Sequence, residues 1–231
     1  MWQGKNKAIT FSFDDGVLQD VRTVEILNRY GLKSTFNLNS GLLGVNMQLH
    51  IGNNVYVDHN KVLPAQVKDV YAGHEVAVHT VKHPNLTTLS EEEIVEQVEG
   101  DRETLSELCG YPVVGMAYPC GGVNNDDRVA DVLRRRTPIR YSRTITSTHN
   151  FDLQENLLRF NPTVYWVESC LEEIVDEFLA LKTDKPQLLY IWGHSYEADG
   201  FAINWERFEK ICAKLAKKSD IFYGTNKEVL L

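Results

Sequence analysis

The chain has 231 residues, of which 43% are hydrophobic and 24% are charged, a composition typical of a globular protein with a sizeable core. Its 24 basic and 32 acidic side chains give a net charge of −8, which disfavours contact with phosphate backbones or anionic lipid, so we expect neither nucleic acid nor a membrane as a partner. The first apolar run, residues 8–13, is too short for a signal peptide or a spanning helix.

Short apolar, β-rich runs alternate with amphipathic helical stretches along the chain. Strands are expected at residues 8–13, 35–39, 75–79, 113–118, 139–145, 157–164, 187–192 and 220–223. Helices are expected at residues 21–30, 64–72, 90–109, 126–135, 169–181 and 204–217. Two of these helices are expected to begin with a capping box, Ser90 with Glu93 and Ser169 with Glu172.

Residues 40–63 interrupt this alternation and are interpreted as a loop insertion that carries a hairpin, with Gly52, Asn53 and Asn54 supplying the turn. The remainder forms roughly seven or eight β/α repeats with no linker and no glycine-rich phosphate motif after the first strand. This pattern favours a closed or nearly closed barrel over an open doubly wound sheet. We expect one domain over residues 1–231.

Barrel enzymes carry their active residues at the carboxyl ends of strands, and polar side chains follow most of the predicted strands. They are Asp14 and Asp15, then Asn37 and Asn39, then His79 with His83, then Tyr118, and finally His194. A carboxylate with two imidazoles is a common ligand set for a divalent ion, and Asp15, His79 and His83 could supply it. Strand alternation points Asp14 away from Asp15, which leaves Asp14 free to act as a general base.

Each of these motifs also has an ordinary structural explanation. Asp14-Asp15-Gly16 alone fits a turn with a helix cap, and His79-x-x-x-His83 alone fits solvent-facing or structural histidines. Their placement after neighbouring strands of one barrel favours a functional site, because unrelated turns need not gather ionisable groups on one rim.

Other candidate residues carry two interpretations each. Cys120 is expected to be a small buried thiol, with zinc ligation as the alternative. The aromatic side chains around the later strands are expected either to pack or to stack on a sugar face; they are Tyr165, Trp166, Trp192 and Tyr196. The remaining histidines lack such neighbours, and we expect them to be structural or solvent-facing; they are His50, His59, His74 and His149.

Taken together, the motifs resemble those of the polysaccharide deacetylases of the NodB-homology type, carbohydrate esterase family 4. The matching segments occur in the family's order, from about Ile9 to Tyr196. They are TFSFDDG at 10–16, STFNLNSG at 34–41, HTVKH at 79–83, AYPCG at 117–121 and IWGHSYE at 191–197.

The resemblance implies an α/β fold, a distorted (β/α) barrel of about seven strands. It implies a divalent metal ion on Asp15, His79 and His83, zinc first, with cobalt, nickel or manganese as alternatives. Asp14 would be the general base, and His194 the acid that protonates the departing amine.

The implied reaction is hydrolysis of a non-peptide C–N bond, which releases acetate from an N-acetylated amino sugar or oligosaccharide. The family's oxyanion donor is a backbone N–H near Tyr118, and Asn37 and Trp192 complete the predicted substrate-contacting set. The insertion at residues 40–63 could wall off one end of the cleft, which would favour small substrates over polymers, or it could form an exposed dimer contact. The sequence carries no signal for an oligomeric state.

The chain departs from the family pattern at two places. Ala117 stands where members carry an arginine that holds the base, and residues 161–166, NPTVYW, lack the aspartate that orients the catalytic histidine. We expect another arginine to hold the base, and another acidic residue to orient the catalytic histidine. The candidates are Arg143 or Arg159 beside Asp14, and Glu197 or Asp152 beside His194.

Two other functions are compatible with the sequence. A relaxed third and fourth motif also occurs in relatives that open cyclic imides or ureides, and a metal-binding or carbohydrate-binding protein without turnover is a more distant alternative. The presence of both Asp14 and His194 argues against loss of turnover, because a binding protein needs no base opposite an acid. The four cysteines match neither a zinc knuckle nor a disulfide scaffold, so we expect free thiols and a cytoplasmic location.

Overall fold

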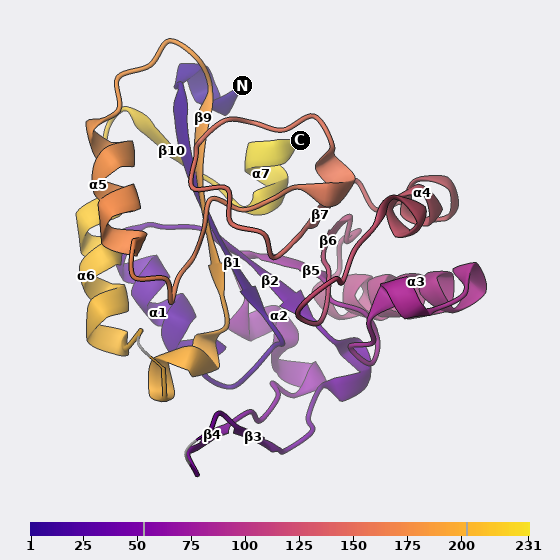
Figure 1. Ribbon diagram of the computed structural model, residues 1–231. Helices are drawn as coiled ribbons and strands as arrows, with labels where there is room; N and C mark the ends of the chain where they lie inside the picture. The colour runs from indigo at the N-terminus through magenta and orange to yellow at the C-terminus, as the bar shows by residue number, and fades with distance from the viewer. Residues whose placement is uncertain (53, 202) are drawn as a thin grey trace.

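The computed structural model describes residues 1–52, 54–201 and 203–231, and its centre is a parallel sheet (Figure 1). The strands are β1 (Lys7–Asp14), β2 (Ser34–Leu38), β5 (Glu75–Val78), β6 (Gly115–Ala117), β7 (Tyr141–Arg143), β8 (Val164–Tyr165), β9 (Gln187–Gly193) and β10 (Ile221–Tyr223). They lie in the order β7-β6-β5-β2-β1-β9-β8. Along one edge of β1, its first residues (7–9) pair with β10 and its last residues (11–14) pair with β2.

The two edges of this sheet approach each other through a single parallel bridge. Phe160 donates its N–H to Ser142 O and accepts from Thr144 N, both at 2.9 Å, which joins β7 to the segment leading into β8. Thr163 N then donates to Tyr190 O on β9, also at 2.9 Å. The sheet is therefore a curled half-barrel with helices around it, and the expected distorted (β/α) barrel is confirmed.

The helices cover the outside of the sheet, with α1, α5 and α6 on one side and α3 and α4 on the other (Figure 1). The α-helices are α1 (Asp20–Tyr30), α2 (Val67–Val70), α3 (Glu91–Cys109), α4 (Asp127–Arg136), α5 (Leu171–Ala180), α6 (Trp205–Leu215) and α7 (Asn226–Leu230). Short 3₁₀ turns are η1 (Trp2–Gly4), η2 (Ser40–Leu42), η3 (Pro64–Gln66), η4 (Leu86–Thr88), η5 (Leu157–Arg159) and η6 (Ser195–Asp199). Among the described residues, no helix has the length and apolar composition needed to cross a bilayer.

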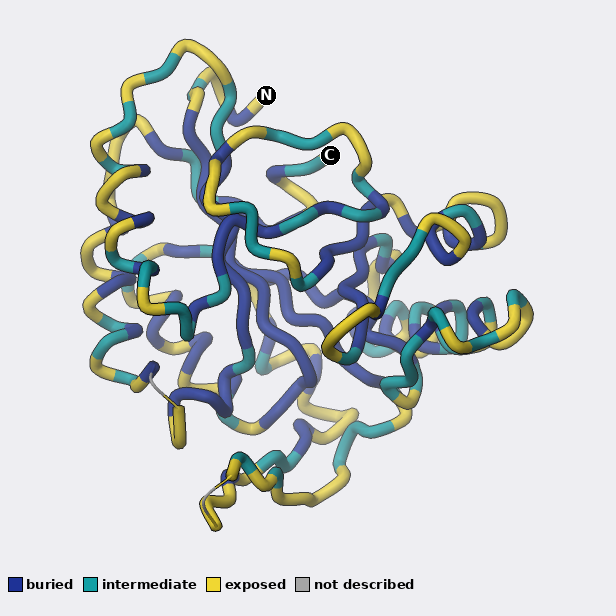
Figure 2. The backbone as a smooth tube through the Cα atoms, in the orientation of Figure 1, coloured by how far each residue is buried: buried dark blue, intermediate teal, exposed yellow. Residues whose placement is uncertain are grey.

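Side-chain alternation along β1 gives the sheet an apolar outer face and a polar inner face. Phe11 and Phe13 pack edge-on against Phe208 of α6, at centroid distances of 6.2 and 5.9 Å. Thr10 and Ser12, which alternate with them, face the barrel interior, where both hydrogen-bond to the side chain of Asn226. All of β1 is buried (Figure 2), so the polar side chains of its inner face are enclosed along with the apolar side chains that face the helices.

Two predicted elements are wrong. The strand expected at 157–164 is confined to Val164–Tyr165, because residues 157–159 form a 3₁₀ turn and Pro162 has no N–H to donate to a ladder. The capping box expected at Ser169 does not form: α5 begins at Leu171, and Glu172 pairs with Arg207 of α6 instead. The box at Ser90 and Glu93 is confirmed by reciprocal hydrogen bonds of 3.3 and 2.8 Å.

The insertion at residues 40–63 contains the expected hairpin, an antiparallel pair of β3 (Gln48–His50) and β4 (Tyr56–Asp58). Of the three turn residues proposed, Asn53 lies outside the described residues. The segment after β4 runs back along the loop that follows β1, where Leu18 N donates to Asn60 O at 2.8 Å and Val62 N donates to Gly16 O at 2.9 Å. The insertion is thereby fixed beside the carboxyl end of β1, although its own surface is mostly exposed (Figure 2).

Candidate active site

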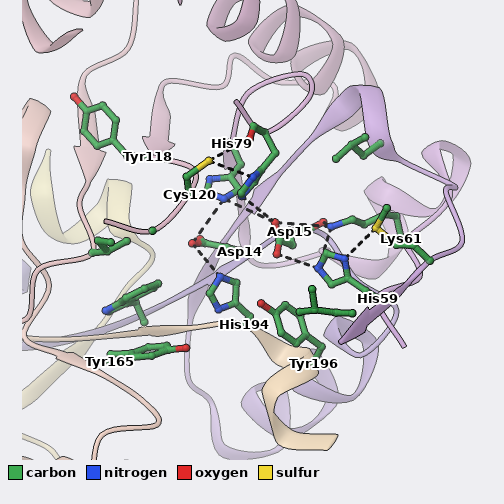
Figure 3. A pocket seen from close by; sticks show the side chains of 17 residues that line it. Asp14, Asp15, His59, Lys61, His79, Tyr118, Cys120, Tyr165, His194 and Tyr196 are labelled. Atoms are coloured by element: carbon green, nitrogen blue, oxygen red, sulfur yellow. Dashed lines mark hydrogen bonds and ion pairs between the residues drawn. The ribbon is translucent and has the colours of Figure 1, made fainter. Parts of the chain in front are cut away.

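A pocket of about 540 Å³ opens at the carboxyl ends of the central strands (Figure 3). The five ionisable residues singled out in the sequence all line it; they are Asp14, Asp15, His79, His83 and His194. Strands β1, β5 and β9 deliver them, as expected for a barrel whose strands end on one rim.

Three of these residues present ligand atoms to a common point. Asp15 Oδ1 lies 3.9 Å from His79 Nε2 and 3.6 Å from His83 Nε2, and the three donor atoms all lie within 4.8 Å of one another. His79 Nδ1 lies 2.9 Å from Ala117 O, so it carries the proton and leaves Nε2 as the ligand. Bonds of about 2.0–2.2 Å from one ion span both distances from Asp15 Oδ1 to the imidazoles, so the residues fit a divalent metal.

The protonation of the three residues suits metal binding. Burial lowers the pKa of His79 to about 4 and also lowers the pKa of His83, so both imidazoles are neutral. Burial alone would raise the pKa of Asp15, but the His59 hydrogen bond and the Lys61 charge outweigh it and hold that pKa well below its ordinary value. Neutral imidazoles and an ionised carboxylate are the forms that ligate a cation.

The backbone turns sharply where the ligands leave their strands. Asp15, Thr80 and His83 have φ values of 82°, 70° and 59°, in the left-handed region that residues other than glycine seldom adopt. Because of the turn at Asp15, this side chain and Asp14 face the same pocket, and His79 Nε2 lies 3.9 Å from a carboxylate oxygen of each. The expectation that strand alternation points the two aspartates apart is therefore wrong.

Asp14 is held by an arginine from another strand. Arg143 donates from Nη2 to both carboxylate oxygens, at 2.6 Å from Oδ1, and Asn37 Nδ2 donates to Oδ1 at 2.8 Å. Arg143 is fully buried at the end of β7, directly paired in register with Ala117, where the family carries its arginine. Burial raises the pKa of Asp14, but the Arg143 charge more than compensates, and the resulting pKa is below the ordinary value.

Of the two arginine candidates, only Arg143 reaches the base. Arg159 instead binds Asn125 and Asp127 near the start of α4. Asn37 is wholly buried and supports Asp14 rather than lining the pocket, which corrects its predicted role in substrate contact.

His194 is supported by a buried carboxylate three residues later. Glu197 accepts from His194 Nδ1 at 3.1 Å and from the His194 backbone N–H at 2.9 Å. It also accepts hydrogen bonds from the Tyr165 hydroxyl and from Trp166 Nε1. A Cβ at Gly193 would lie 2.2 Å from the Trp166 ring, so a residue without a side chain is needed for the indole to reach Glu197.

This support raises the basicity of His194. Burial disfavours the charged imidazole, but Glu197, followed by Asp15 and Asp14, outweighs it and raises the pKa of His194 to about 9. The other acid considered, Asp152, accepts from Gln187 Nε2 at 2.8 Å instead. His194 Nε2 faces Asp14 Oδ2 at 4.0 Å.

Two pocket residues were missed because they come from the insertion. His59 Nε2 lies 3.1 Å from Asp15 Oδ2, and Lys61 Nζ donates to Asp15 O at 2.8 Å (Figure 3). We expected His59 to be structural or solvent-facing, and this is wrong. Neither residue has a spacing relation to Asp15 in the sequence, and only the return of the hairpin along the loop after β1 brings them there.

The backbone N–H of Tyr118 itself is not free to bind an oxyanion. Tyr118 N donates to Arg143 O at 3.0 Å, its hydroxyl donates to Leu158 O at 2.7 Å, and the ring points away from the two aspartates (Figure 3). Within the described part of the chain, the peptide N–H groups of Cys120 and Gly121, which also line the pocket, donate no hydrogen bond. The Cys120 thiol is half-buried and donates to His83 O at 3.4 Å.

The remaining histidines differ from one another. His74 is buried, with Nδ1 accepting from Ser34 N at 3.2 Å, and is structural as expected. His50 is exposed on the hairpin and lies against Tyr56. His149 is exposed, as expected, and it contacts Glu168 and lies close to Cys170.

The chain was compared with protein-family models, curated proteins and solved structures. The polysaccharide deacetylase family model matches residues 3–136. A peptidoglycan-N-acetylglucosamine deacetylase, PgdA, of Listeria monocytogenes is 30% identical over 122 residues, which are 52% of this chain and 22% of the relative. Chitin deacetylase 1 of Cryptococcus neoformans is 31% identical over 88 residues, 36% of this chain and 18% of the relative.

Solved structures have the same fold at low identity. A family 4 carbohydrate esterase from Streptomyces lividans superposes with a TM-score of 0.58 at 16% identity, covering 96% of this chain and 93% of that one. A CE4 family pseudoenzyme from Bacillus anthracis has a TM-score of 0.55 at 17% identity, covering 98% and 66%.

The chain spans about a fifth of the length of the curated relatives, whereas the family model covers more than half of the chain itself. The matched residues include β1, β2, β5 and all three residues that present ligand atoms. The chain therefore belongs to the polysaccharide deacetylase family.

Proposed function

We propose that this protein is a metal-dependent hydrolase that removes the acetyl group from an N-acetylated amino sugar. One observation carries the proposal: a carboxylate and an imidazole face each other beside the three ligand residues, and each is held by its own buried ionic partner. Asp14 is held by Arg143 and His194 by Glu197, with 4.0 Å between Oδ2 and Nε2. Independent structural turns would not require two such supported groups at one point.

The ligand set suits a first-row divalent ion. Two imidazoles and one carboxylate are a common zinc site that leaves positions open for other ligands, and cobalt, nickel and manganese accept the same donors. When bound, such an ion lowers the pKa of a coordinated water and polarises a carbonyl oxygen.

The residues of the chain would then handle the protons. Asp14 is ionised because Arg143 stabilises its charge, so it can accept a proton from the attacking water. His194 is protonated near neutral pH because its pKa is about 9, and its Nε2 can donate to the departing amine. The free N–H groups of Cys120 and Gly121 are placed to bind the negative oxygen of the tetrahedral intermediate.

An acetylated sugar suits the walls of the pocket. Trp192, Tyr165 and Tyr196 line the pocket, and the Trp192 and Tyr165 rings stack at a centroid distance of 4.4 Å. Met47 and Leu49 of the insertion also line it. Aromatic faces beside an apolar wall favour one or a few sugar rings. The relatives named above are described as acting on peptidoglycan N-acetylglucosamine and on chitin, which favours a sugar over a cyclic imide.

The test is a substrate screen with chelator-stripped protein reloaded with each ion. We expect acetate release from small N-acetyl sugars or short chitooligosaccharides, and none from the stripped protein. Ring opening of cyclic imides without acetate release would contradict the substrate, and full activity of metal-free protein would contradict the mechanism.

Two substitutions separate chemistry from metal binding. Asp14→Asn is expected to reduce turnover at least about 10²-fold while the metal stays bound, because it removes the base and no ligand. His79→Ala is expected to lose the metal itself, measured by elemental analysis after gel filtration. If Asp14→Asn released the metal, or kept full turnover, the assigned roles would be wrong.

A further inference from the structure

A second group of metal-ligating side chains lies outside the pocket, on the loop after β7 and at the start of α5. This group, the His-Glu-Cys cluster, consists of His149, Glu168 and Cys170. His149 Nε2 lies 2.5 Å from Glu168 Oε2, and Cys170 Sγ lies 3.9 Å from the imidazole nitrogen and 3.6 Å from the carboxylate oxygen. All three donor atoms lie within 4.8 Å of one another.

The spacing of the donors corresponds to the first coordination shell of a small ion. Tetrahedral zinc with the usual bond lengths separates nitrogen, oxygen and sulfur ligands by about 3.4–3.6 Å. The two sulfur distances are close to that value, and the His149–Glu168 pair, at 2.5 Å, would have to open by about 0.9 Å when an ion enters. Without an ion, His149 and Cys170 both direct their polar atoms at Glu168 Oε2, and partial burial and Glu168 both raise the pKa of the Cys170 thiol; an ion bound to all three would replace these contacts.

Contacts around the cluster fix its donors. The other oxygen of Glu168 accepts from Ser147 Oγ and from Tyr165 N at 3.1 Å, which leaves Oε2 directed at the imidazole and the thiol. His149 N donates to Thr163 O at 2.9 Å, so the chain bearing the imidazole is tied to the chain that leads into β8. Hydrogen bonds to the second oxygen of a ligating carboxylate are a regular feature of protein metal sites.

We propose that the His-Glu-Cys cluster is a second divalent-metal site, selective for a borderline-soft ion such as zinc, with its fourth position open to water. One thiolate, one imidazole and one carboxylate form a mixed donor set that favours zinc over magnesium or calcium. The side chain of His149 is 49% exposed and that of Glu168 is 26% exposed, so an ion can enter from solvent. Binding converts the Cys170 thiol to a thiolate and releases one proton to solvent.

The site would have a structural role, because it would stabilise two segments at the rim of the pocket. It would join the loop after β7 to the segment between β8 and α5. Tyr165, the last residue of β8, directly precedes that segment: its N–H is held by Glu168, its ring lines the pocket, and its hydroxyl donates to Glu197. An ion on the cluster would therefore fix the position of an aromatic wall of the pocket.

The test uses cobalt as a spectroscopic probe on the full chain. Chelator-stripped protein is titrated with Co²⁺, and the thiolate-to-cobalt charge-transfer band in the near ultraviolet is followed together with the bound stoichiometry. We expect a second equivalent of metal per chain and a charge-transfer band. The residues presented to the Asp15 site are a carboxylate and two imidazoles, so it is not expected to give that band.

Substitutions of single residues show which cysteine gives rise to the charge-transfer band. Cys170→Ser and His149→Ala are expected to weaken the second equivalent at least about tenfold and, for Cys170→Ser, to abolish the band. His79→Ala should lose the other equivalent and keep the band. Cys120→Ser is the matched control, because that thiol lies beside His83, and it should leave the band unchanged.

Two outcomes would overturn the inference. One is a single equivalent without a charge-transfer band in the wild-type chain. The other is a band that survives Cys170→Ser and disappears in Cys120→Ser, which would place the thiolate in the pocket. Circular dichroism of each variant verifies that it is folded, and neither outcome depends on turnover.

Discussion

Glu197 determines how His194 behaves, through its charge as well as its hydrogen bond. The groups that face the imidazole are Asp14 at the end of β1, Asp15 directly after it, Glu197 of η6, and the rings of Tyr165, Trp192 and Tyr196. The three carboxylates favour the protonated form, and their combined effect exceeds the cost of burial. His194 therefore loses its proton only as the pH rises through about 9.

Glu197→Gln is expected to shift the basic limb of the pH–rate profile to lower pH. The neutral amide removes the main cause of the raised pKa, so His194 is deprotonated at a lower pH and the acid is lost sooner. The measurement is kcat against pH for the metal-loaded wild type and variant. An unchanged basic limb, with metal content equal in both proteins, would show that His194 is not the acid.

The choice between Glu197 and Asp152 could not be made from sequence alone. Glu197 is near His194 in the chain, but the three further donors that converge on it come from elsewhere or from the backbone. The left-handed turns at Asp15 and His83 were likewise not predictable, because such conformations are imposed by surrounding contacts rather than by local preference.

At the scale of elements, the hairpin insertion contributes to a site that the sequence motifs alone assign to the strands. Asp15 presents Oδ1 to the two imidazoles and Oδ2 to His59. The hairpin thus fixes the orientation of a ligand that belongs to β1. Lys61 adds a hydrogen bond to the Asp15 carbonyl.

His59→Ala is expected to weaken metal binding by about 10–100-fold, because it removes the hydrogen bond that orients the Asp15 carboxylate. His59→Gln retains an N–H donor and should lose less. Competition with a chromophoric chelator measures the affinity, and His50→Ala, an exposed position on the same hairpin, is the control that should bind normally. If the metal affinity of His59→Ala were within twofold of the wild-type value, His59 would have no part in orienting Asp15.

Elements with strong local signals were predicted well. The burial pattern of β1 and the cap of α3 can be read from apolar runs and from the Ser90–Glu93 spacing. The strand expected at 157–164 was wrong because residues 157–159 form a 3₁₀ turn and Pro162 has no N–H for a ladder. The position of the hairpin was not predictable because its contacts with the loop after β1 are remote in sequence.

Across the whole molecule, a buried ion pair spans the interior of the barrel. Arg143 lies at the end of β7 and Asp14 at the end of β1, with β6, β5 and β2 between them in the sheet. Both side chains are at most 2% exposed. Leaving one such charge buried without the other is costly, whereas removing both is much less so.

Arg143→Met is expected to lower the free energy of unfolding by about 3–5 kcal/mol, because Asp14 is left charged and unpaired in the interior. The double variant Arg143→Met with Asp14→Asn should lose clearly less unfolding free energy than Arg143→Met alone. Urea unfolding of the metal-free proteins measures both, with Asp14→Asn alone completing the cycle. Additive losses in the double variant would contradict a direct coupling.

The register of the sheet explains how the departure at the third motif is accommodated. Ala117 of β6 and Arg143 of β7 are paired in register on adjacent strands. The arginine that binds Asp14 therefore comes from β7 in this chain, one strand away from the position of the third motif. Sequences that lack the arginine of the third motif can therefore be sorted by whether a neighbouring strand supplies one. A substitution that looks, in the sequence, like the loss of the residue that holds the base can therefore be a transfer of that role to a residue on the neighbouring strand.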